Sequence, residues 1–351
     1  MIEEVEARLF GLVNTNRDFR TRESWGKNQF NSSFPAALCC YLAYKNLDAN
    51  YLCIKQGVYL SDSISINNLF GMEYDSDDIF YAFEFQHSPF QRYIIGSIPR
   101  TDLVIQRKSS GECLTGLEVK LTALPDNTTC DYVDSLYGSE IVVRPDSIVY
   151  LACSVASGLN DKLNTIIPDI QISDWTDGNL VLRHIKEIIN TIVNISIELE
   201  NDQKPFLIQP VWKTIGKSPI LADNCLDVFV WSDAGFCHFI SKIAKSEENA
   251  TTITRQTRTA IWLFKMLAEI KINGHFNHKQ IIDSLSYNTK NDKAFATAGA
   301  LTNKFMTSDR LLKPAILKDE IKEIVLGGGQ NLLSPERRFD AILFNTPDIF
   351  I

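Results

Sequence analysis

Two acidic residues and a lysine stand at spacings that suit metal-dependent chemistry on phosphate esters. Asp102 lies near the start of one apolar run, and Glu118 and Lys120 stand two residues apart in the next. Two carboxylates can hold Mg²⁺, which prefers oxygen ligands, acidifies a bound water and neutralises charge growing on a phosphate. A lysine beside a metal and apolar walls can have a lowered pKa, so Lys120 could orient or help deprotonate the attacking water. Together these side chains would cut a phosphodiester bond.

Two short strands joined as a hairpin are expected to position these residues. Residues 98–106 and 116–124 are largely apolar, and Lys108-Ser-Ser-Gly-Glu112 between them suits a turn. Glu118 and Lys120 leave the same face of their strand, near the level at which Asp102 enters its own. The flanking residues predict buried strands, in which charges are costly unless paired or metal-bound. The spacing by itself also fits a solvated strand face.

The residues around the three charges resemble a known family. Pro99-Arg100-Thr101-Asp102 followed by Glu118-Val119-Lys120 resembles the PD-(D/E)xK nuclease signature. Longer stretches resemble the HindVP-type family of type II restriction endonucleases, and the resemblance spans most of the chain. Besides the hairpin, those stretches are Gln209–Pro219, Leu221–Trp231 and Ser334–Ala341.

The resemblance implies an α/β fold with a restriction-endonuclease-like core, a mixed central sheet flanked by helices, and an additional mostly helical C-terminal part. It implies Asp102 and Glu118 as catalytic metal ligands and Lys120 as the residue that positions the water. Some nucleases of this fold take a further acid from a preceding helix, which makes Glu84 a candidate third carboxylate. A surface acid on an amphipathic helix is the alternative for Glu84.

The resemblance also implies Mg²⁺ as cofactor and double-stranded DNA as substrate. The expected target is a short palindrome of the GRCGYC kind, cut to leave 5′-phosphates. A palindrome cut on both strands predicts a homodimer, because the symmetry of the enzyme then matches that of the site. A cognate DNA methyltransferase is expected in the same system.

The chain divides near Gln203-Lys204-Pro205. Residues 1–202 are expected to form the nuclease core with N-terminal helices, and residues 203–351 a part that contributes to DNA binding and dimerisation, unless both form one continuous domain. Apolar periodicity predicts helices, and apolar β-branched runs predict strands. The expected helices are 3–13, 35–44, 179–200 and 251–272, and the expected strands outside the hairpin are 147–155 and a pair, 226–231 with 235–240.

Several basic residues are candidates for DNA contacts. Arg255, Arg258, Trp262 and Lys265 fall on one stripe of the 251–272 helix, which could follow a DNA backbone. Other candidates are Arg100, Lys213, Lys217, Arg337 and Arg338. Each of them also fits a solvated surface.

Composition points to a cytoplasmic protein with no membrane partner. No apolar run approaches the ~20 residues that span a bilayer, and Met1-Ile-Glu-Glu-Val-Glu lacks a secretory pattern. None of the 8 cysteines forms a Cys-x-x-Cys pair. The net charge of −8 argues against a non-specific DNA coat, although a cleft can be positive on an acidic protein.

Two other functions fit the same residues. One is another nuclease of this fold, such as a repair or junction-resolving enzyme, which would share the metal site without reading a sequence. The other is a non-enzymatic DNA-binding protein in which the charged hairpin is structural.

Overall fold

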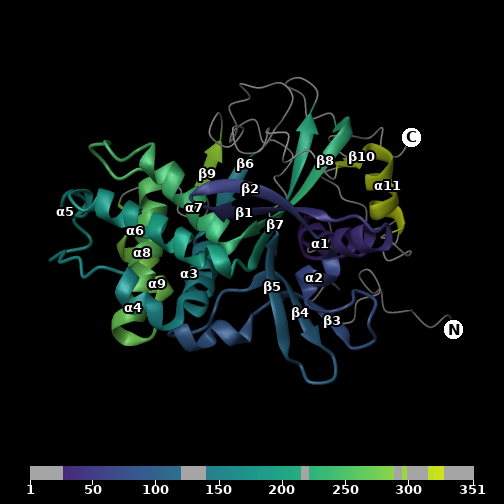
Figure 1. The fold of residues 1–351 in the computed structure, drawn as a ribbon, viewed down its shortest axis with the longest axis horizontal. Coiled ribbons are helices and arrows are strands. Elements are labelled where there is room, and N and C mark those ends of the chain that lie inside the picture. Colours follow the sequence, from purple (N-terminus) through teal and green to yellow (C-terminus); the bar gives the residue numbers. More distant parts are fainter. Residues whose placement is uncertain (1–26, 120–139, 215–220, 288–294, 299–314, 328–351) are drawn as a thin grey trace.

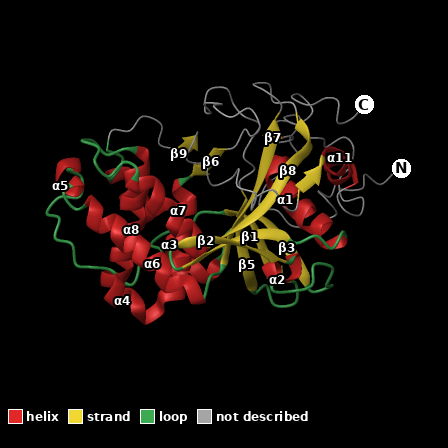
Figure 2. Cartoon of the chain, turned by 45° about the horizontal axis from the view of Figure 1, so that its top comes forward, coloured by secondary structure: helices red, strands yellow, loops and turns green. Residues whose placement is uncertain are grey.

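The computed structural model of the chain describes residues 27–119, 140–214, 221–287, 295–298 and 315–327. A central mixed sheet separates two groups of helices (Figure 1). No helix among the described residues is both long and apolar enough to cross a bilayer. The fold is therefore the mixed α/β class expected, with helices on both sides of the strands (Figure 2).

The central sheet has eight strands in the order β2-β1-β8-β7-β5-β4-β3, with β10 paired to β8. Most neighbours are antiparallel, whereas β1 with β8 and β5 with β7 are parallel. The strands are β1 (Ala49–Lys55), β2 (Val58–Ile64), β3 (Ile79–Phe85), β4 (Thr101–Arg107), β5 (Cys113–Val119), β7 (Pro205–Thr214), β8 (Leu221–Ser232) and β10 (Ala315–Leu317). A separate pair joins β6 (Glu140–Val143) to β9 (Phe295–Ala298). Because β7 and β8 lie inside the sheet, the chain after residue 202 shares one sheet with the hairpin.

The helices cover the two faces of the sheet and create two cores. One core holds side chains of α3, α6, α7 and α8 with Phe229 and Trp231 of β8. The other holds side chains of α1, α2 and α11 with Val228 and Val230, which alternate with the first pair along the same strand. The helices are α1 (Lys27–Tyr44), α2 (Ile66–Phe70), α3 (Pro145–Leu159), α4 (Leu163–Ile166), α5 (Gly178–Leu182), α6 (Ile185–Glu198), α7 (Asp233–Lys245), α8 (Arg255–Asn273), α9 (His278–Ser284) and α11 (Lys318–Gly327), with short 3₁₀ helices η3 (Ser88–Tyr93), η4 (Asn160–Lys162) and η5 (Leu199–Asn201).

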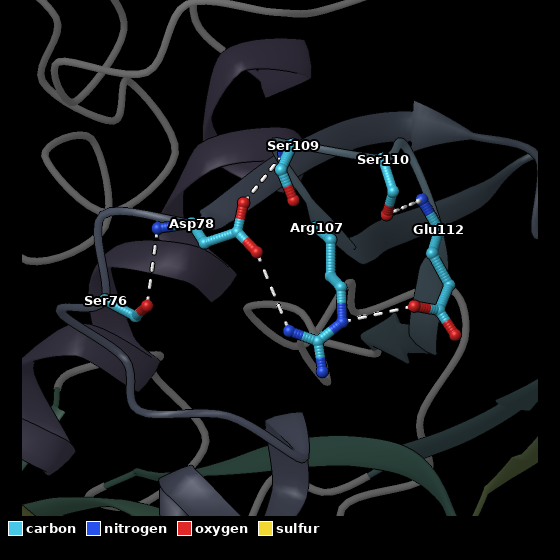
Figure 3. A network of polar contacts seen from close by, with 6 residues as sticks. All are labelled: Ser76, Asp78, Arg107, Ser109, Ser110 and Glu112. Carbon is cyan, nitrogen blue, oxygen red and sulfur yellow. Dashed lines mark hydrogen bonds and ion pairs between the residues drawn. The ribbon is translucent and has the colours of Figure 1, made fainter.

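The hairpin predicted from the sequence is confirmed as β4 and β5, although residues 120–124 of its second predicted strand lie outside the described residues. Leu103, Val104, Ile105 and Leu117 are fully buried, because helices or strands cover both faces of this pair. Residues 108–112 form the turn, where Arg107 contacts Asp78 (3.6 Å) and Glu112 (3.1 Å) (Figure 3). The Ser109 N–H donates to Asp78 (2.7 Å), and hydrogen bonds from Ser109 lower the pKa of the Asp78 carboxyl. A polar network therefore fixes the turn end of the hairpin.

The strand expected over 147–155 is instead part of α3. Its side chains from Ser147 to Ala156 are all buried, so this part of the helix is covered around its whole circumference and has no solvent-exposed polar face. A short continuous apolar run of this kind fits a buried strand and a buried helix equally. Pro145 in the first turn is the signal that favours the helix.

The strand pair expected over 226–231 and 235–240 is half wrong. β8 contains the first segment, but residues 235–240 belong to α7. The Ser232 hydroxyl accepts a hydrogen bond from the Gly235 N–H and so caps that helix (2.8 Å). The antiparallel partners of β8 are β7, which precedes it in the chain, and β10, which follows it.

The three helices that the sequence predicts within the described residues, over 35–44, 179–200 and 251–272, are present. The first, α1, begins at Lys27 and contains Pro35 rather than starting there. The 179–200 segment is split into α5 and α6 around Arg183 and His184. Residues 255–273 form α8, capped by Thr254. The helix expected over 3–13 lies outside the described residues.

Candidate active site

The register of the hairpin sets Asp102 and Glu118 opposite each other. Leu103 pairs with Leu117 across the antiparallel strands, so the next residues outward, Asp102 and Glu118, share one level. Side chains at one level of an antiparallel pair point to the same face. Leu117 and Val119 face the core under α1, so Glu118 between them faces the α3 side of the sheet. The two acids therefore meet on one face at the outer end of the hairpin.

Hydrogen bonds tie each of the two carboxylates to the opposite strand. Asp102 Oδ2 accepts from the Val119 N–H (2.9 Å). Glu118 Oε2 accepts from the Thr101 hydroxyl (3.1 Å) and, at longer range, from the Asp102 N–H (3.4 Å). Glu118 is buried, with 7% of its surface exposed, whereas Asp102 is half-buried. These donors orient both carboxylates.

A cavity of about 360 Å³ lies beside Glu118. Its walls come from β5, the start of β7, η3 and α3. The residues that line the cavity include His87, Thr101, Gly116, Glu118, Tyr150 and Lys204. Glu118 of the acid pair therefore borders a space that a substrate group or water can enter.

The cavity wall contains a buried neutral imidazole. His87 packs on Gly116, where a Cβ would lie 3.3 Å from the His87 ring, and its ring meets Phe90 edge-on at 4.7 Å. Burial lowers the pKa of His87 to about 4, and Nδ1 has no hydrogen-bond partner among the described residues. The imidazole is therefore uncharged at neutral pH.

A second buried group supports the far wall of the cavity. Asp233, the first residue of α7, accepts from the Lys204 N–H (3.0 Å) and from the Ser154 hydroxyl (3.2 Å). Burial raises the pKa of this carboxyl to about 6, against the opposite influence of these donors. Asp233 thereby joins α3, β7 and α7 behind the site.

The donor set of the acid pair fits a hard divalent cation. Two carboxylates on one face supply oxygen ligands, and Mg²⁺ keeps several waters, so two protein ligands suffice. Two facing carboxylates at a partly buried position repel each other, and a bound cation offsets that repulsion. Within the described part of the chain no three His, Cys, Asp or Glu residues group closely enough to hold a metal.

Glu84 lies on strand β3, not on the helix expected from the sequence. Phe83 pairs with Leu103 and Phe85 with Thr101, so Glu84 stands level with Asp102. Its φ of 47° puts it in the left-handed region, which interrupts the pairing at this level. Glu84 is thus next to the acid pair in register, but does not form a three-residue metal group with it in the described structure.

The basic stripe expected on α8 is buried at its centre and half-buried at Arg255 and Lys265. Arg258 and Trp262 are buried, and Arg258 donates to the Ser286 carbonyl (2.8 Å) while Trp262 donates to that of Leu285 (3.0 Å). Helix α8 lies within the helical group, where Arg258 and Trp262 anchor the segment after α9. Because Arg258 is fully buried, the prediction that it follows a DNA backbone is wrong, and Arg255 is half-buried.

The remaining candidates are partly covered by the structure. Arg100 is exposed, two residues before Asp102. Lys213 falls on β7, but its side chain is outside the described part. Lys120, Lys217, Arg337 and Arg338 also lie outside the described residues.

Sequence reasoning missed Thr101, Tyr150 and Lys204, which the structure brings to the site. Thr101 could have been found, because it directly precedes Asp102 in the sequence. Lys204 is exposed at the cavity, yet in the sequence it reads only as part of a connection. Tyr150 lies in the 147–155 run that was predicted as a strand, and nothing in that run indicates that its hydroxyl bonds to Pro99 and His87.

Comparison with known proteins gives matches over nearly the whole chain. Residues 25–350 match the HindVP restriction endonuclease family. The chain is 50% identical over 349 residues to the probable type II restriction enzyme HindVP of Haemophilus influenzae (strain ATCC 51907 / DSM 11121 / KW20 / Rd), covering 99% of this chain and 96% of that protein. It is 40% identical over 350 residues to the type II restriction enzyme HgiDI of Herpetosiphon aurantiacus, covering 97% and 96%. No solved structure matches the chain.

Proposed function

The chain belongs to the HindVP restriction endonuclease family, and on that premise we propose that it hydrolyses double-stranded DNA at a short palindrome with Mg²⁺ bound by Asp102 and Glu118. The observation that carries this proposal is the facing of these two carboxylates across β4 and β5 beside a cavity. Similarity to named type II restriction enzymes favours site-specific cleavage over the alternatives of a repair nuclease or a binding protein.

The proposed mechanism assigns a role to each side chain of the hairpin. Asp102 and Glu118 hold the cation, and the Thr101 hydroxyl and the Val119 N–H keep their carboxylates oriented. A bound Mg²⁺ supplies a more acidic water and neutralises charge on the phosphate. Lys120 orients the attacking water and takes up or shares its proton. Attack at phosphorus breaks the bond to the 3′ oxygen, so the products carry 5′-phosphates.

The exposed Arg100 and Lys204 flank the site and are the proposed cations that meet the DNA backbone. Lys213, Lys217, Arg337 and Arg338 remain proposals for the same role, as does the half-buried Arg255. A GRCGYC-like target, a homodimer that matches its symmetry, action in the cytoplasm and a cognate methyltransferase complete the proposal.

A plasmid digestion tests the reaction and the site together. The wild type is incubated with plasmid in Mg²⁺ and in EDTA beside Lys120→Ala and Asp102→Asn, and the fragment ends are sequenced. Discrete fragments that require metal, end in ligatable 5′-phosphates and vanish in both variants are expected. Smears or branch-specific nicks would indicate a repair nuclease, whereas tight DNA binding without cleavage would indicate a binding protein.

Two further measurements test the target and the assembly. Duplexes that carry a GRCGYC site and duplexes with one base pair changed should differ in cleavage by orders of magnitude. Sedimentation of the protein should give a dimer, and both strands should be cut within one binding event. A monomer that nicks each strand independently would contradict the proposed symmetry.

A further inference from the structure

The hydroxyl of Tyr150 on α3 lies between two backbone groups next to the acid pair. It donates a hydrogen bond to the Pro99 carbonyl (2.7 Å) and accepts one from the His87 N–H (3.1 Å). The side chain is buried, with 4% of its surface exposed. A single hydroxyl thus uses both its donor and an acceptor lone pair on the main chain.

These two backbone groups bracket the segment that connects β3 to β4. His87 stands two residues after the end of β3, and Pro99 stands two residues before the start of β4. Gln86 makes a second link at the same place, because its Nε2 donates to the Ile98 carbonyl (2.7 Å). These hydrogen bonds therefore hold the two ends of the connecting segment together, and Tyr150 attaches both ends to α3.

The Pro99 end of this segment leads directly into the acid pair. Thr101, two residues beyond Pro99, donates to Glu118, and Asp102 follows it. Pro99 has no N–H, so its main chain can be held by hydrogen bonding only through the carbonyl that Tyr150 binds. A displacement of Pro99 would therefore move Thr101 and Asp102 relative to Glu118.

We propose that Tyr150 is a positioning residue that sets the Asp102–Glu118 geometry through the Pro99 carbonyl. This inference rests on the proposed function of that pair. The two hydrogen bonds of the Tyr150 hydroxyl go to backbone groups, so it acts through the backbone that precedes β4. Errors of about 1 Å in the placement of reacting groups cost about 10²-fold in rate, so the effect should be measurable.

Tyr150→Phe isolates the hydroxyl. The aromatic ring keeps the packing in the core, and because Tyr150 lines the cavity, water can reach the two backbone groups that lose their partner. The fold should therefore persist while the backbone before β4 relaxes. A matched control is Tyr287→Phe, which removes a hydroxyl that also donates to a backbone carbonyl over 2.7 Å, that of Trp175, in the helical group.

The experiment is single-turnover cleavage of a plasmid by the full chain, with enzyme and Mg²⁺ each titrated. For Tyr150→Phe we expect a maximal rate ~10–100-fold below wild type, a half-saturating Mg²⁺ concentration several-fold higher, and an unchanged half-saturating enzyme concentration. Tyr287→Phe should lower thermal stability comparably and leave these kinetic constants as in the wild type. If the Tyr150 hydroxyl had a purely structural role, both variants would change the kinetic constants to the same extent.

Two results would overturn the inference. One is a maximal rate and Mg²⁺ requirement for Tyr150→Phe that equal those of Tyr287→Phe at a temperature at which both are folded. The other is a change confined to the half-saturating enzyme concentration, since Tyr150 would then act on DNA binding. If Tyr150→Phe does not fold, Gln86→Leu serves as the second test. This variant removes the hydrogen bond to the Ile98 carbonyl, which joins the same two ends of the segment, and it should lower the maximal cleavage rate in the same way.

The proposed function and this inference fail in distinguishable ways. If the wild type does not cleave DNA, the proposed function is contradicted. If the Asp102→Asn variant cleaves normally, the proposed site is contradicted. Cleavage that is lost in Asp102→Asn but unchanged in Tyr150→Phe removes only the role of Tyr150.

Discussion

The two ends of the β4–β5 hairpin hold acidic side chains in contrasting surroundings. At the turn, the half-buried Asp78 and the exposed Glu112 share Arg107, with further hydrogen bonds from the turn backbone (Figure 3). At the outer end, Asp102 and Glu118 face each other, one half-buried and one buried, and receive N–H and hydroxyl hydrogen bonds. Exposed ion pairs of the first kind contribute little to stability. Like charges of the second kind are costly, and a site that retains them suits metal binding.

The same substitution at the two ends gives the largest expected contrast. Glu118→Gln should lower the rate of DNA cleavage about 10³-fold, because it removes a charged metal ligand from the reaction. Glu112→Gln should leave the rate within about twofold of wild type, since it changes only an exposed ion pair. Equal losses in both variants, measured by single-turnover cleavage, would mean that the active site is misplaced.

Cation binding should also separate the two ends in the absence of DNA. Mg²⁺ at 100 times its dissociation constant should raise the free energy of unfolding by about 2.7 kcal/mol in the wild type and in Glu112→Gln. Glu118→Gln should lose most of this gain, and without metal it should be at least as stable as wild type because the repulsion is relieved. Thermal unfolding over a Mg²⁺ series measures both effects, and an identical gain in all three proteins would contradict binding at the outer end.

Acid sensitivity should come from the groups beside the outer end. His87 has a folded pKa of about 4, below its unfolded value, so its contribution to stability is complete above about pH 6.5 and is lost as pH falls towards 4. We expect a loss of about 2 kcal/mol over this window, less than the full shift implies because the cavity admits water. His87→Gln should flatten this part of the stability curve.

Two other buried groups belong in the same titration. His238 also has its pKa lowered to about 4 by burial, so it loses stability in the same direction. Asp233 has its pKa raised to about 6, so its contribution is complete below about pH 4 and is lost as pH rises through 6. The difference curve between wild type and His87→Gln cancels both. A flat difference from pH 7 to pH 4 would show that His87 is not buried as a neutral group.

Glu84 gives the smallest expected effect. Its left-handed backbone costs about 1 kcal/mol, so Glu84→Gly should raise the free energy of unfolding by up to that amount. Glu84→Gln keeps the backbone cost and tests the carboxylate, and its cleavage rate should fall far less than that of Glu118→Gln. A loss as large as that of Glu118→Gln would add Glu84 to the metal site.

The hairpin was predictable from the sequence because all its determinants are local. Apolar runs, turn residues and the spacing of Asp102 from Glu118 lie within a single short segment, and alternation fixes which side chains share a face. The family resemblance is confirmed by a match over residues 25–350. Long amphipathic helices such as α6 were predictable for the related reason that burial on one face leaves a clear period.

The errors arise where burial removes that period or where partners are distant. α3 is buried around its circumference, so its sequence fits a strand equally well. The polar stripe of α8 fits a surface, but the segment after α9 covers it and supplies carbonyls for Arg258 and Trp262. The contact of Tyr150 with Pro99 joins residues far apart in the chain, which no local pattern can indicate.

The short parallel pairing of β5 with β7 bears on the order of folding. Strands β3, β4 and β5 follow one another between residues 79 and 119, whereas β5 meets β7 through Glu118 with Leu207 and Val119 with Ile208 in the described structure. Closing a long loop costs more chain entropy than pairing neighbouring strands. We therefore expect the three-stranded meander to form first, with Asp102 and Glu118 already opposite each other, and the docking of α3 and β7 to follow. Catalytic competence would then arise at the last step, when the Tyr150 hydroxyl reaches Pro99.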